Sequence, residues 1–537
     1  MAYVVAAVSL WLALVAVTAL RPRRRGALAA LSYPVGWIAG ELPVQAMVVE
    51  LGLLGLLAWW GWPVGWIDPV VLALALVVVA ANGALLVASF RARAVVARSM
   101  AGADRPLVVT GPGEDVFGRW WRTALQLPLH PRDLIVSANV PYGPEPRHRL
   151  DVWRTREDLA GAPVIFYVHG GAWTFGDKRE QGRPMLHEFC ARGWVAVAAN
   201  YRLAPRHPWP AQIEDVTRTL AWIKREVAAY GGDPDRVVVA GGSAGGHLAA
   251  LLALSADDPT WRPADVLLED WSVRGCLSFY GVLEMTGDET HWRGLGWGLR
   301  RLLEHRVVQV PFKQNEALYR ELSPFHRLDA AAPPFFVVQG VTDTLVDVQV
   351  ARDFVARARE VSLQPVYYVE LPLTQHAFDV TASPRTSATT RAAIAFAESV
   401  AAPRPRLSDE LLECYHVPPT ELEVEVDGAR VGAVEYAARV GPYYVVTSDN
   451  PGSVVRSHEQ NELKRAELTA RLVELGLAVV ATRARDGRGR FPDEVGRVIE
   501  DRSLALGLAR RYDQLALYVV DGAAVSVLDA ATGRALH

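Results

Sequence analysis

The segment from Val237 to His247 reads VVVAGGSAGGH, and it constrains the fold more than any other part of the chain. A short β-branched run leads into Gly241, Ser243 and Gly245, and a helical pattern follows. A strand, a tight turn that holds a serine, and a helix make a nucleophile elbow, in which the serine hydroxyl projects above a sheet. Small residues must flank the serine, because the turn crowds any larger side chain. We therefore expect a parallel sheet covered by helices.

The sequence pattern of residues 131–402 fits such a sheet, since short apolar runs alternate with longer amphipathic stretches. The expected strands are Leu150–Arg154, Val164–Val168, Val195–Ala199, Val237–Ala240, Phe335–Gln339 and Val366–Glu370. The expected helices are Ile213–Ala229, Gly246–Ser255, Val348–Val361 and Arg391–Val400. This order predicts an α/β fold with a doubly wound, mostly parallel sheet.

A second glycine-rich loop, His169-Gly170-Gly171-Ala172-Trp173, follows the expected strand Val164–Val168. Small residues let the backbone approach a substrate carbonyl, so we expect the N–H groups of Gly170, Gly171 and Ala172 to join that of Ala244 in an oxyanion hole. Ala172 is compatible with this role, because a backbone donor does not require glycine. We expect His169 to fix the turn by hydrogen bonding rather than to serve as a catalytic base.

Together these motifs resemble the hormone-sensitive-lipase-like branch of the α/β-hydrolase fold, and especially membrane-associated carboxylesterases of actinobacteria. The resemblance covers about residues 140–400 and includes Tyr201-Arg202-Leu203-Ala204-Pro205, Gly231-Gly232-Asp233-Pro234 and His376-Ala377-Phe378. It departs at Ala172, where many members have a third glycine, and this difference bears on how bulky an alcohol the loop accepts.

The resemblance implies a catalytic triad in the chain order Ser, Asp, His. Ser243 would be the nucleophile and His376 the base, with the acid in the loop after Phe335–Gln339. Asp343 and Asp347 compete for the last role. Asp343 is preferred because it lies in the loop that leaves the strand, whereas Asp347 is expected to be the N-cap of the next helix.

The implied activity is that of a serine carboxylesterase that acts on a small or lipid-like ester through an acyl-enzyme. The triad mechanism calls for neither a metal nor an organic cofactor. The glycine-rich stretches are not phosphate-binding loops, because they lack the lysine of a P-loop and dinucleotide-binding spacing. We expect His247, four residues after Ser243, to be a packing residue. Residues 284–322 interrupt the sheet pattern, and they form either a cap over the cleft or an ordinary domain helix with a solvated basic face. The alternative function is a tethered binding or regulatory module with a degenerate hydrolase fold.

Three apolar segments occupy the N-terminal region, residues 1–98, and predict membrane spans at about 3–20, 44–62 and 70–90. Glu50 makes the second span the most ambiguous. Arginines follow the first and third segments, at Arg21–Arg25 and Arg91–Arg98, and the positive-inside rule places both clusters in the cytoplasm. The catalytic domain of a multi-pass protein of the bacterial inner membrane would then be cytoplasmic. A cleaved signal peptide is the less favoured alternative, because no basic residue precedes the first apolar segment.

The rest of the chain is less informative. We expect an irregular chain over residues 91–130, of which 99–130 would connect the membrane region to the catalytic domain, with Trp120 and Trp121 at the bilayer interface. Residues 403–406 would be a linker, and residues 407–537 a small α+β domain that resembles a bacterial family of unknown function. A net charge of -3 supplies no basic field for nucleic acid. The three cysteines lack metal-ligand spacing.

Overall fold

The structure is a computed structural model, and it describes most of the chain. The described residues are 2–22, 29–60, 68–103, 105–109, 134–155, 158–256, 258–266, 271–287, 296–403, 422–426, 428–449, 457–475, 477–484, 494–512, 514, 516–521 and 524–530. Trp120, Trp121 and the linker residues 404–406 lie outside them.

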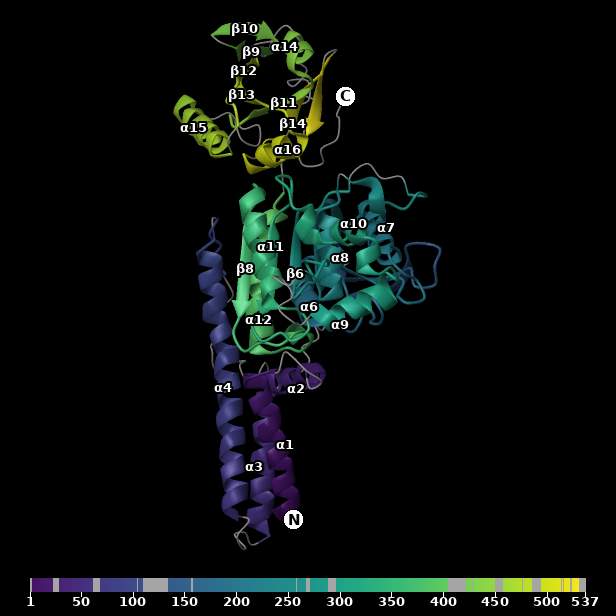
Figure 1. Cartoon of the computed structure of the whole chain (residues 1–537), viewed down its shortest axis with the longest axis vertical. Helices are drawn as coiled ribbons and strands as arrows, with labels where there is room; N and C mark the ends of the chain where they lie inside the picture. Colours follow the sequence, from purple (N-terminus) through teal and green to yellow (C-terminus); the bar gives the residue numbers. More distant parts are fainter. Residues whose placement is uncertain are drawn as a thin grey trace.

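Among the described residues before the catalytic region, the helices are α1 (Ala2–Leu20), α2 (Ala29–Glu41), α3 (Pro43–Trp59) and α4 (Asp68–Ala101). Two stretches, Tyr3–Leu20 and Pro69–Ala101, are long and apolar enough to cross a membrane. A third candidate span results only if α2 and α3 are taken as one, and these two helices meet at an angle of 81°. Figure 1 shows α1, α3 and α4 side by side, with α2 lying across the end of this bundle.

The N-terminal helices differ from the expectations in two ways. α2 is a separate helix although Pro34 lies inside it, and its existence was not predicted. The expectation of an irregular chain from residue 91 is wrong for residues 91–101, because α4 continues to Ala101. Ala92, Val96 and Met100 recur every four residues and are buried in the core of the catalytic region. This apolar stripe explains why the helix continues.

Glu50 has a partner inside the helical bundle. Its side chain is fully buried, and Ser9 Oγ of α1 donates a hydrogen bond of 2.7 Å to Glu50 Oε1 of α3. A buried carboxyl group in an apolar bundle needs such a partner. The contact therefore joins two helices of the bundle.

The catalytic region contains an eight-stranded sheet in the order β1-β2-β4-β3-β5-β6-β7-β8. β2 pairs antiparallel with β1 and β4, and the remaining neighbours are parallel. The strands are β1 (Ile135–Pro141), β2 (Arg149–Arg154), β3 (Ala162–Val168), β4 (Val195–Ala199), β5 (Gly232–Gly242), β6 (Gly275–Phe279), β7 (Phe335–Gly340) and β8 (Val366–Leu371).

Helices cover both faces of this sheet. Alternate residues of β5 show the division, since Val237 and Val239 belong to one core and Val238 and Ala240 to the other. The first core also takes side chains from α7 (Ala211–Glu226), α8 (Ala244–Ala253) and α11 (Val348–Val361). The second takes them from α4, α6 (Arg183–Ala191) and α12 (Pro384–Val400). The arrangement is the predicted α/β-hydrolase fold.

The C-terminal region has a sheet of its own, with seven strands in the order β10-β9-β12-β13-β11-β14-β15 and every neighbouring pair antiparallel. The strands are β9 (Leu422–Val426), β10 (Ala429–Gly432), β11 (Tyr443–Thr447), β12 (Ala481–Ala484), β13 (Glu494–Ile499), β14 (Ala516–Val520) and β15 (Val525–Asp529). Its helices are α14 (Ala433–Val440), α15 (His458–Glu474) and α16 (Arg502–Arg511). This is the small α+β unit that the sequence predicts.

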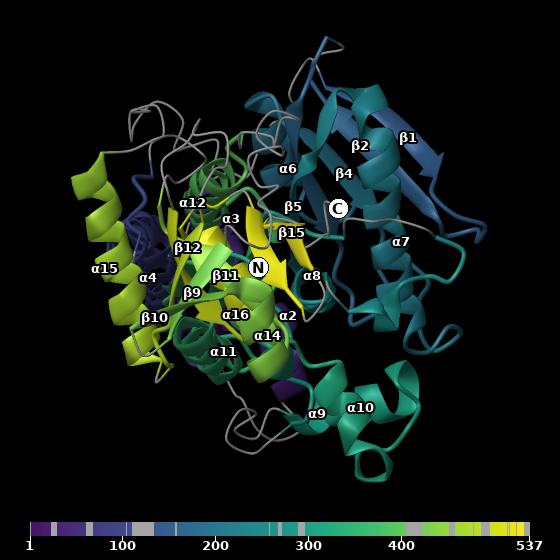
Figure 2. The same cartoon turned by 90° about the horizontal axis from the view of Figure 1, so that it is seen from above.

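The α16 helix rests on the catalytic region at the end far from α2, as Figure 1 shows, and Figure 2 views the molecule from that end. Arg510 Nη1 donates to the Ala331 carbonyl at 2.9 Å, and Arg511 Nη1 donates to the Leu363 carbonyl at 3.2 Å. The C-terminal unit is therefore remote from the carboxyl ends of the parallel strands.

Candidate active site

Ser243 occupies the sharp turn between β5 and α8. Its backbone has φ 56° and ψ −123°, a conformation that L-residues rarely adopt. A Cβ atom on Gly241 would lie 2.4 Å from the Gly245 backbone, and one on Gly245 would lie 2.1 Å from the Val168 carbonyl. Both flanking positions therefore require glycine, which explains the motif. The strained serine marks a nucleophile elbow in geometry as well as in sequence.

The loop His169–Trp173 lies directly beside this serine. A Cβ atom on Gly170 would lie 3.2 Å from Ser243 Cβ, so the two backbones are in close approach. Gly171 has φ 112°, which favours glycine, and Ala172 has φ 50°. The N–H of Gly170 donates to Gln181 Oε1 at 2.8 Å. The expectation that Gly170 supplies an oxyanion donor therefore needs correction, and Gly171, Ala172 and Ala244 remain as candidates.

His169 fixes this loop from within. Its Nδ1 lies 2.7 Å from the Gly170 carbonyl oxygen, and its ring stacks on Tyr201 with centroids 4.3 Å apart. Burial lowers the pKa of His169 to about 4, so the imidazole is neutral at physiological pH. His169 thus has the structural role that the sequence suggests.

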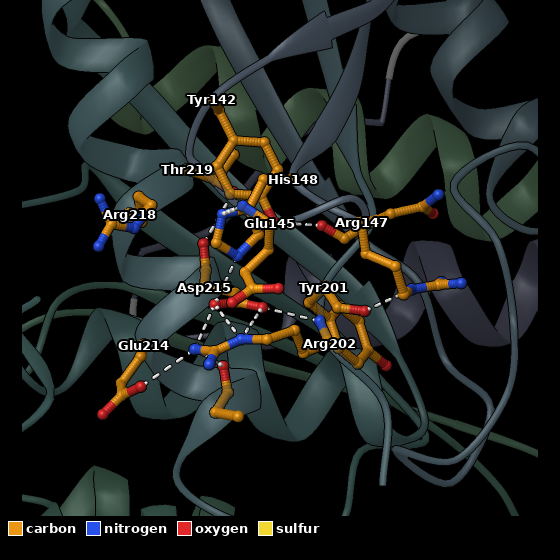
Figure 3. A network of polar contacts seen from close by, with 12 residues as sticks. Tyr142, Glu145, Arg147, His148, Tyr201, Arg202, Glu214, Asp215, Arg218 and Thr219 are labelled. Carbon is orange, nitrogen blue, oxygen red and sulfur yellow. Dashed lines mark hydrogen bonds and ion pairs between the residues drawn. The ribbon is translucent and has the colours of Figure 1, made fainter. Parts of the chain in front are cut away.

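A polar network surrounds the buried carboxylate of Asp215 and includes Tyr201 and Arg202 (Figure 3). The carboxylate of Asp215 accepts hydrogen bonds of 2.7 Å from both the backbone N–H and Nη2 of Arg202, and His148 Nε2 lies 2.9 Å away. Burial raises the pKa of Asp215, but hydrogen bonds from His148 and Arg202 outweigh it and hold this pKa below its usual value. The Tyr201-Arg202 segment is therefore anchored to α7.

Arg147 connects the segment at Tyr201 to the loop 169–176. Its Nε donates to the Tyr201 carbonyl at 2.8 Å, and its Nη2 donates to the Gly176 carbonyl at 3.0 Å. Tyr201 in turn donates its hydroxyl to the His169 carbonyl at 3.0 Å. Loop 169–176 is thus tied to the segment that carries the YRLAP motif.

His376 and Asp343 form a buried pair at the carboxyl ends of β7 and β8. His376 Nδ1 lies 2.7 Å from Asp343 Oδ2, and the Asp343 side chain is fully buried. The backbone N–H groups of Leu345 and Val346 donate to Asp343 Oδ1 at 2.8 and 2.9 Å, and Gln339 Nε2 donates to Oδ2 at 2.9 Å. The carboxylate is held in one orientation, with an oxygen directed at the imidazole.

The competing acid has a different role. Asp347 accepts a hydrogen bond from Gln349 N at 3.0 Å and is the N-cap of α11, as the sequence predicts. The structure brings Asp343, and not Asp347, to His376.

Tyr280 links the elbow to the histidine. Its ring lies 4.5 Å from the His376 ring, and a Cβ atom on Gly242 would lie 2.7 Å from its hydroxyl oxygen. The hydroxyl donates to the buried carboxyl of Asp379. Gly242, directly before Ser243, and His376 therefore both lie against Tyr280, which brings the elbow and the Asp343–His376 pair close together.

Sequence reasoning missed Tyr280 because it missed the strand that ends before it. β6 reads GCLSF and has neither alternation nor a β-branched run. Gln339 offered a signal, since it is a polar residue at the end of an otherwise apolar buried strand. Gln375 offered none, because its partners come from distant parts of the chain.

His247 is a packing residue, as the sequence suggests. Trp173 Nε1 donates to His247 Nδ1 at 3.2 Å, and His247 Nε2 lies 2.8 Å from the Leu322 carbonyl oxygen. Burial lowers its pKa to about 4, which keeps the ring neutral.

Among the described residues, no group of three or more His, Cys, Asp or Glu side chains could hold a metal ion.

The expected cap over residues 284–322 is described in part, since residues 288–295 lie outside the described residues. It contains two short helices, α9 (Gly296–Leu302) and α10 (Glu316–Glu321). The Arg300 guanidinium lies 4.0 Å from the centroid of the Phe312 ring, so one of the basic side chains packs inside this segment.

The fold and this site define an α/β hydrolase, and comparisons with known proteins identify the branch. Residues 150–357 match the BD-FAE family model. The chain is 39% identical over 411 residues to the probable carboxylic ester hydrolase LipM of Mycobacterium tuberculosis. The aligned residues make up 72% of this chain and 90% of LipM. It is 41% identical over 260 residues to esterase LipQ of the same organism, covering 48% of this chain and 60% of LipQ. The chain belongs to the carboxylic ester hydrolase family that includes LipM, and it is an enzyme of that class.

Two further comparisons match parts of the chain. A solved esterase from Thermogutta terrifontis matches 50% of this chain and 93% of its own, with 22% identity and a TM-score of 0.41. Residues 446–517 match a protein family of unknown function, DUF3293. Within them Arg465 donates to the buried carboxylate of Asp449 through Nε at 2.7 Å, so this unit contains an ion pair of its own.

Proposed function

We propose that this carboxylic ester hydrolase works through a Ser243–His376–Asp343 triad. The observation that carries the proposal is the 2.7 Å contact between His376 Nδ1 and Asp343 Oδ2, made beside a strained serine elbow. An aspartate that binds Nδ1–H leaves Nε2 as the basic nitrogen, which is the tautomer that general-base catalysis by a histidine needs. No other described histidine has a carboxylate in this arrangement next to the elbow.

The chemistry then follows in two halves. His376 Nε2 takes the Ser243 proton as Oγ attacks the ester carbonyl, and the developing oxyanion accepts hydrogen bonds from backbone N–H groups. The imidazolium gives its proton to the leaving alcohol, and an acyl-enzyme remains. Water activated by His376 attacks the acyl carbon and releases the carboxylic acid.

Gly171, Ala172 and Ala244 are the proposed oxyanion donors. Gly171 and Ala172 belong to the loop that contacts Ser243, and Ala244 begins α8 directly after it. A helix N-terminus adds favourable electrostatics for negative charge. Gly170 is not included, because Gln181 already accepts from its N–H.

The enzyme is proposed to be anchored in the inner membrane through residues 1–98, with the catalytic domain in the cytoplasm. Support comes from the apolar helices and from two groups of arginines: Arg21 directly follows α1, and Arg91–Arg98 belong to the part of α4 that packs on the catalytic region. We assign residues 131–402 to the catalytic domain and residues 407–537 to a separate C-terminal domain, because the two sheets have separate cores.

Steady-state hydrolysis of p-nitrophenyl butyrate tests the triad. Ser243→Ala is expected to lower kcat by at least about three orders of magnitude, since the nucleophile is lost. Ser399→Ala is the matched control, because Ser399 lies on α12 and donates only to the Phe396 carbonyl. Equal activity of the two variants would refute the proposed mechanism.

A further inference from the structure

The α2 helix contacts the loop that carries the proposed catalytic histidine. Trp37 Nε1 donates to the Ala377 carbonyl at 2.9 Å, one residue after His376. The Tyr33 ring meets the His376 ring edge-on, with centroids 6.0 Å apart. Two aromatic side chains of one helix thus lie against the imidazole loop, although more than 300 residues separate them in sequence.

Gln375 extends this contact to the acid. Its Oε1 accepts from Thr344 N at 2.8 Å and from His376 N at 3.0 Å, so one side chain joins the loops of Asp343 and His376. A Cβ atom on Gly36 of α2 would lie 3.3 Å from Gln375 Nε2. Both halves of the proposed acid–base pair therefore rest against α2.

Arg385 fixes the far end of the same helix. Its side chain is fully buried, and Nη1 binds Glu41 Oε1 at 2.8 Å and the Gly40 carbonyl at 2.6 Å. Nη2 donates to the Leu373 carbonyl at 3.2 Å, just before the histidine loop. A buried, hydrogen-bonded ion pair holds its partners in one geometry.

The α2 helix also packs against the apolar bundle. The Cβ position on Gly36 that meets Gln375 is also 3.8 Å from Ala19 Cα, in the last turn of the candidate span Tyr3–Leu20. Leu373, just before the histidine loop, packs in one apolar cluster with Ala19 and with Ala39 of α2. The active-site loop therefore lies directly beside the end of this span. Because α2 crosses the end of the bundle and turns by 81° into α3, it would lie along the membrane surface.

The loops around the site also expose apolar side chains. In the described part of residues 134–403, the exposed large apolar side chains are Val136, Phe175 and Leu345. Phe175 follows the proposed oxyanion loop, and Leu345 lies two residues after Asp343. Exposed apolar groups beside a functional site typically meet a ligand or a membrane.

We propose that α2 is the bilayer-facing wall of the esterase site, and that the site takes esters of amphiphiles held in the adjacent leaflet. In this arrangement Trp37 is a positioning residue that acts through the Ala377 carbonyl on His376. The ester group of an amphiphile sits at the headgroup boundary, at the level where α2 holds the catalytic loops. The inference rests on the proposed triad and adds the source of its substrate.

The first arm of the test uses the full chain in phosphatidylcholine nanodiscs. Hexadecyl butyrate is supplied either in the same discs as the enzyme or in separate discs, at equal bulk concentration, and butyrate release is measured. We expect at least about tenfold faster release from the shared discs, with a rate that follows the mole fraction of ester in them. Equal rates from both presentations overturn the proposal.

The second arm compares Trp37→Phe with Trp59→Phe. The first variant removes one hydrogen bond to the histidine loop, whereas Trp59 is 84% exposed on α3. For soluble p-nitrophenyl butyrate we expect Trp37→Phe to lower kcat about fivefold with little change in KM and to shift the acidic limb of the kcat–pH profile, and Trp59→Phe to match the wild type. Identical kcat values and pH profiles for both variants overturn the positioning role.

Two controls separate this inference from the proposed function. Ser243→Ala must be inactive in both arms, since residual activity would refute the triad and not the role of α2. If Trp37→Phe fails to fold, Gly36→Ala replaces it, because its added Cβ meets Gln375. Gly52→Ala is then the control, because a Cβ on Gly52 meets nothing within 4 Å.

Discussion

Asp343 owes its role to its four hydrogen bonds rather than to its position in the sequence alone. Two backbone N–H groups and Gln339 fix the carboxylate, and the remaining direction is filled by His376 Nδ1. Asp347 lies only four residues further on, and its carboxylate caps the N-terminus of α11. The two acids therefore allow a clean comparison.

We expect Asp343→Asn to lower kcat by about three orders of magnitude, because the amide would support the wrong histidine tautomer. Asp347→Asn should leave kcat unchanged, because asparagine and aspartate are about equally good N-caps. The measurement is kcat for p-nitrophenyl butyrate, with the melting temperature as a check on folding. A larger loss in Asp347→Asn would move the acid to that residue.

Asp379 makes a pH-dependent contribution to stability. Burial raises its pKa to about 6, against 3.8 in an unfolded chain. Between about pH 4 and pH 6 the unfolded state therefore loses this proton first, and folding stability falls as the pH rises. The loss is complete above pH 6 and is at most about 3 kcal/mol.

Asp379→Asn should remove that loss, since the amide stays neutral and its oxygen can still accept from Tyr280. We expect a higher melting temperature than the wild type at pH 7.5 and a difference that shrinks toward pH 4. Thermal unfolding across this pH range measures it. A variant whose melting temperature falls by the same amount at every pH would contradict the assignment.

The single residues that the sequence revealed are those whose role depends on local geometry. Ser243, Gly241 and Gly245 are recognisable because one tight turn dictates all three. Tyr280, Gln375 and Trp37 could not be predicted, because each acquires its function from a partner far away in the chain. The engagement of the Gly170 N–H by Gln181 likewise depends on a contact that no motif encodes.

The α2 helix, α4 and α12 meet at Arg385. Its guanidinium binds the carboxylate of Glu41. Because both side chains are buried, water cannot take the place of either partner. Removing one partner of a buried ion pair leaves an uncompensated charge and typically costs 3–5 kcal/mol, whereas replacing both by apolar groups is often neutral. The Arg385–Glu41 pair thus links α2 to α12 of the catalytic domain.

Arg385→Leu is therefore expected to lower the melting temperature of the catalytic domain by several degrees, and Glu41→Leu/Arg385→Leu to recover most of the loss. Unfolding followed by circular dichroism measures both variants in the same discs. A double variant no more stable than the single one would show that the pair does not act as a unit.

The elements of the catalytic sheet were mostly predictable, because buried parallel strands are apolar runs and the helices between them are amphipathic. The sequence did not predict β1, β6 and α6, because their short sequences mix small and polar residues. The α2 helix was not predicted for a different reason. Its Pro34 and Glu41 look like breaks in a membrane span, and only the contacts of Glu41 and Trp37 show why a helix forms there.

Taken as a whole, the molecule has a bundle at one end, the catalytic domain in the middle and the C-terminal unit at the other end (Figure 1). The two arginine clusters, at Arg21–Arg25 and Arg91–Arg98, lie on the same side of the membrane only if two spans separate them. In the proposed topology α4 is one of these spans, and α3, which qualifies as a candidate span only together with α2, is the other.

Alkaline phosphatase fusions test this topology, because the reporter is active only outside the cytoplasm. A fusion within residues 65–68 is expected to be active, and a fusion after Arg98 to be inactive. The opposite pattern would place the catalytic domain outside and move the substrate to the outer leaflet.

The central claim is that Ser243 carries the acyl group during turnover. Its most direct measurement is peptide mapping by mass spectrometry after the nanodisc-embedded enzyme has reacted with a fluorophosphonate. The account predicts one adduct, on the peptide that contains Ser243, and no adduct in Ser243→Ala. An adduct on another residue, or full labelling of Ser243→Ala, would contradict it.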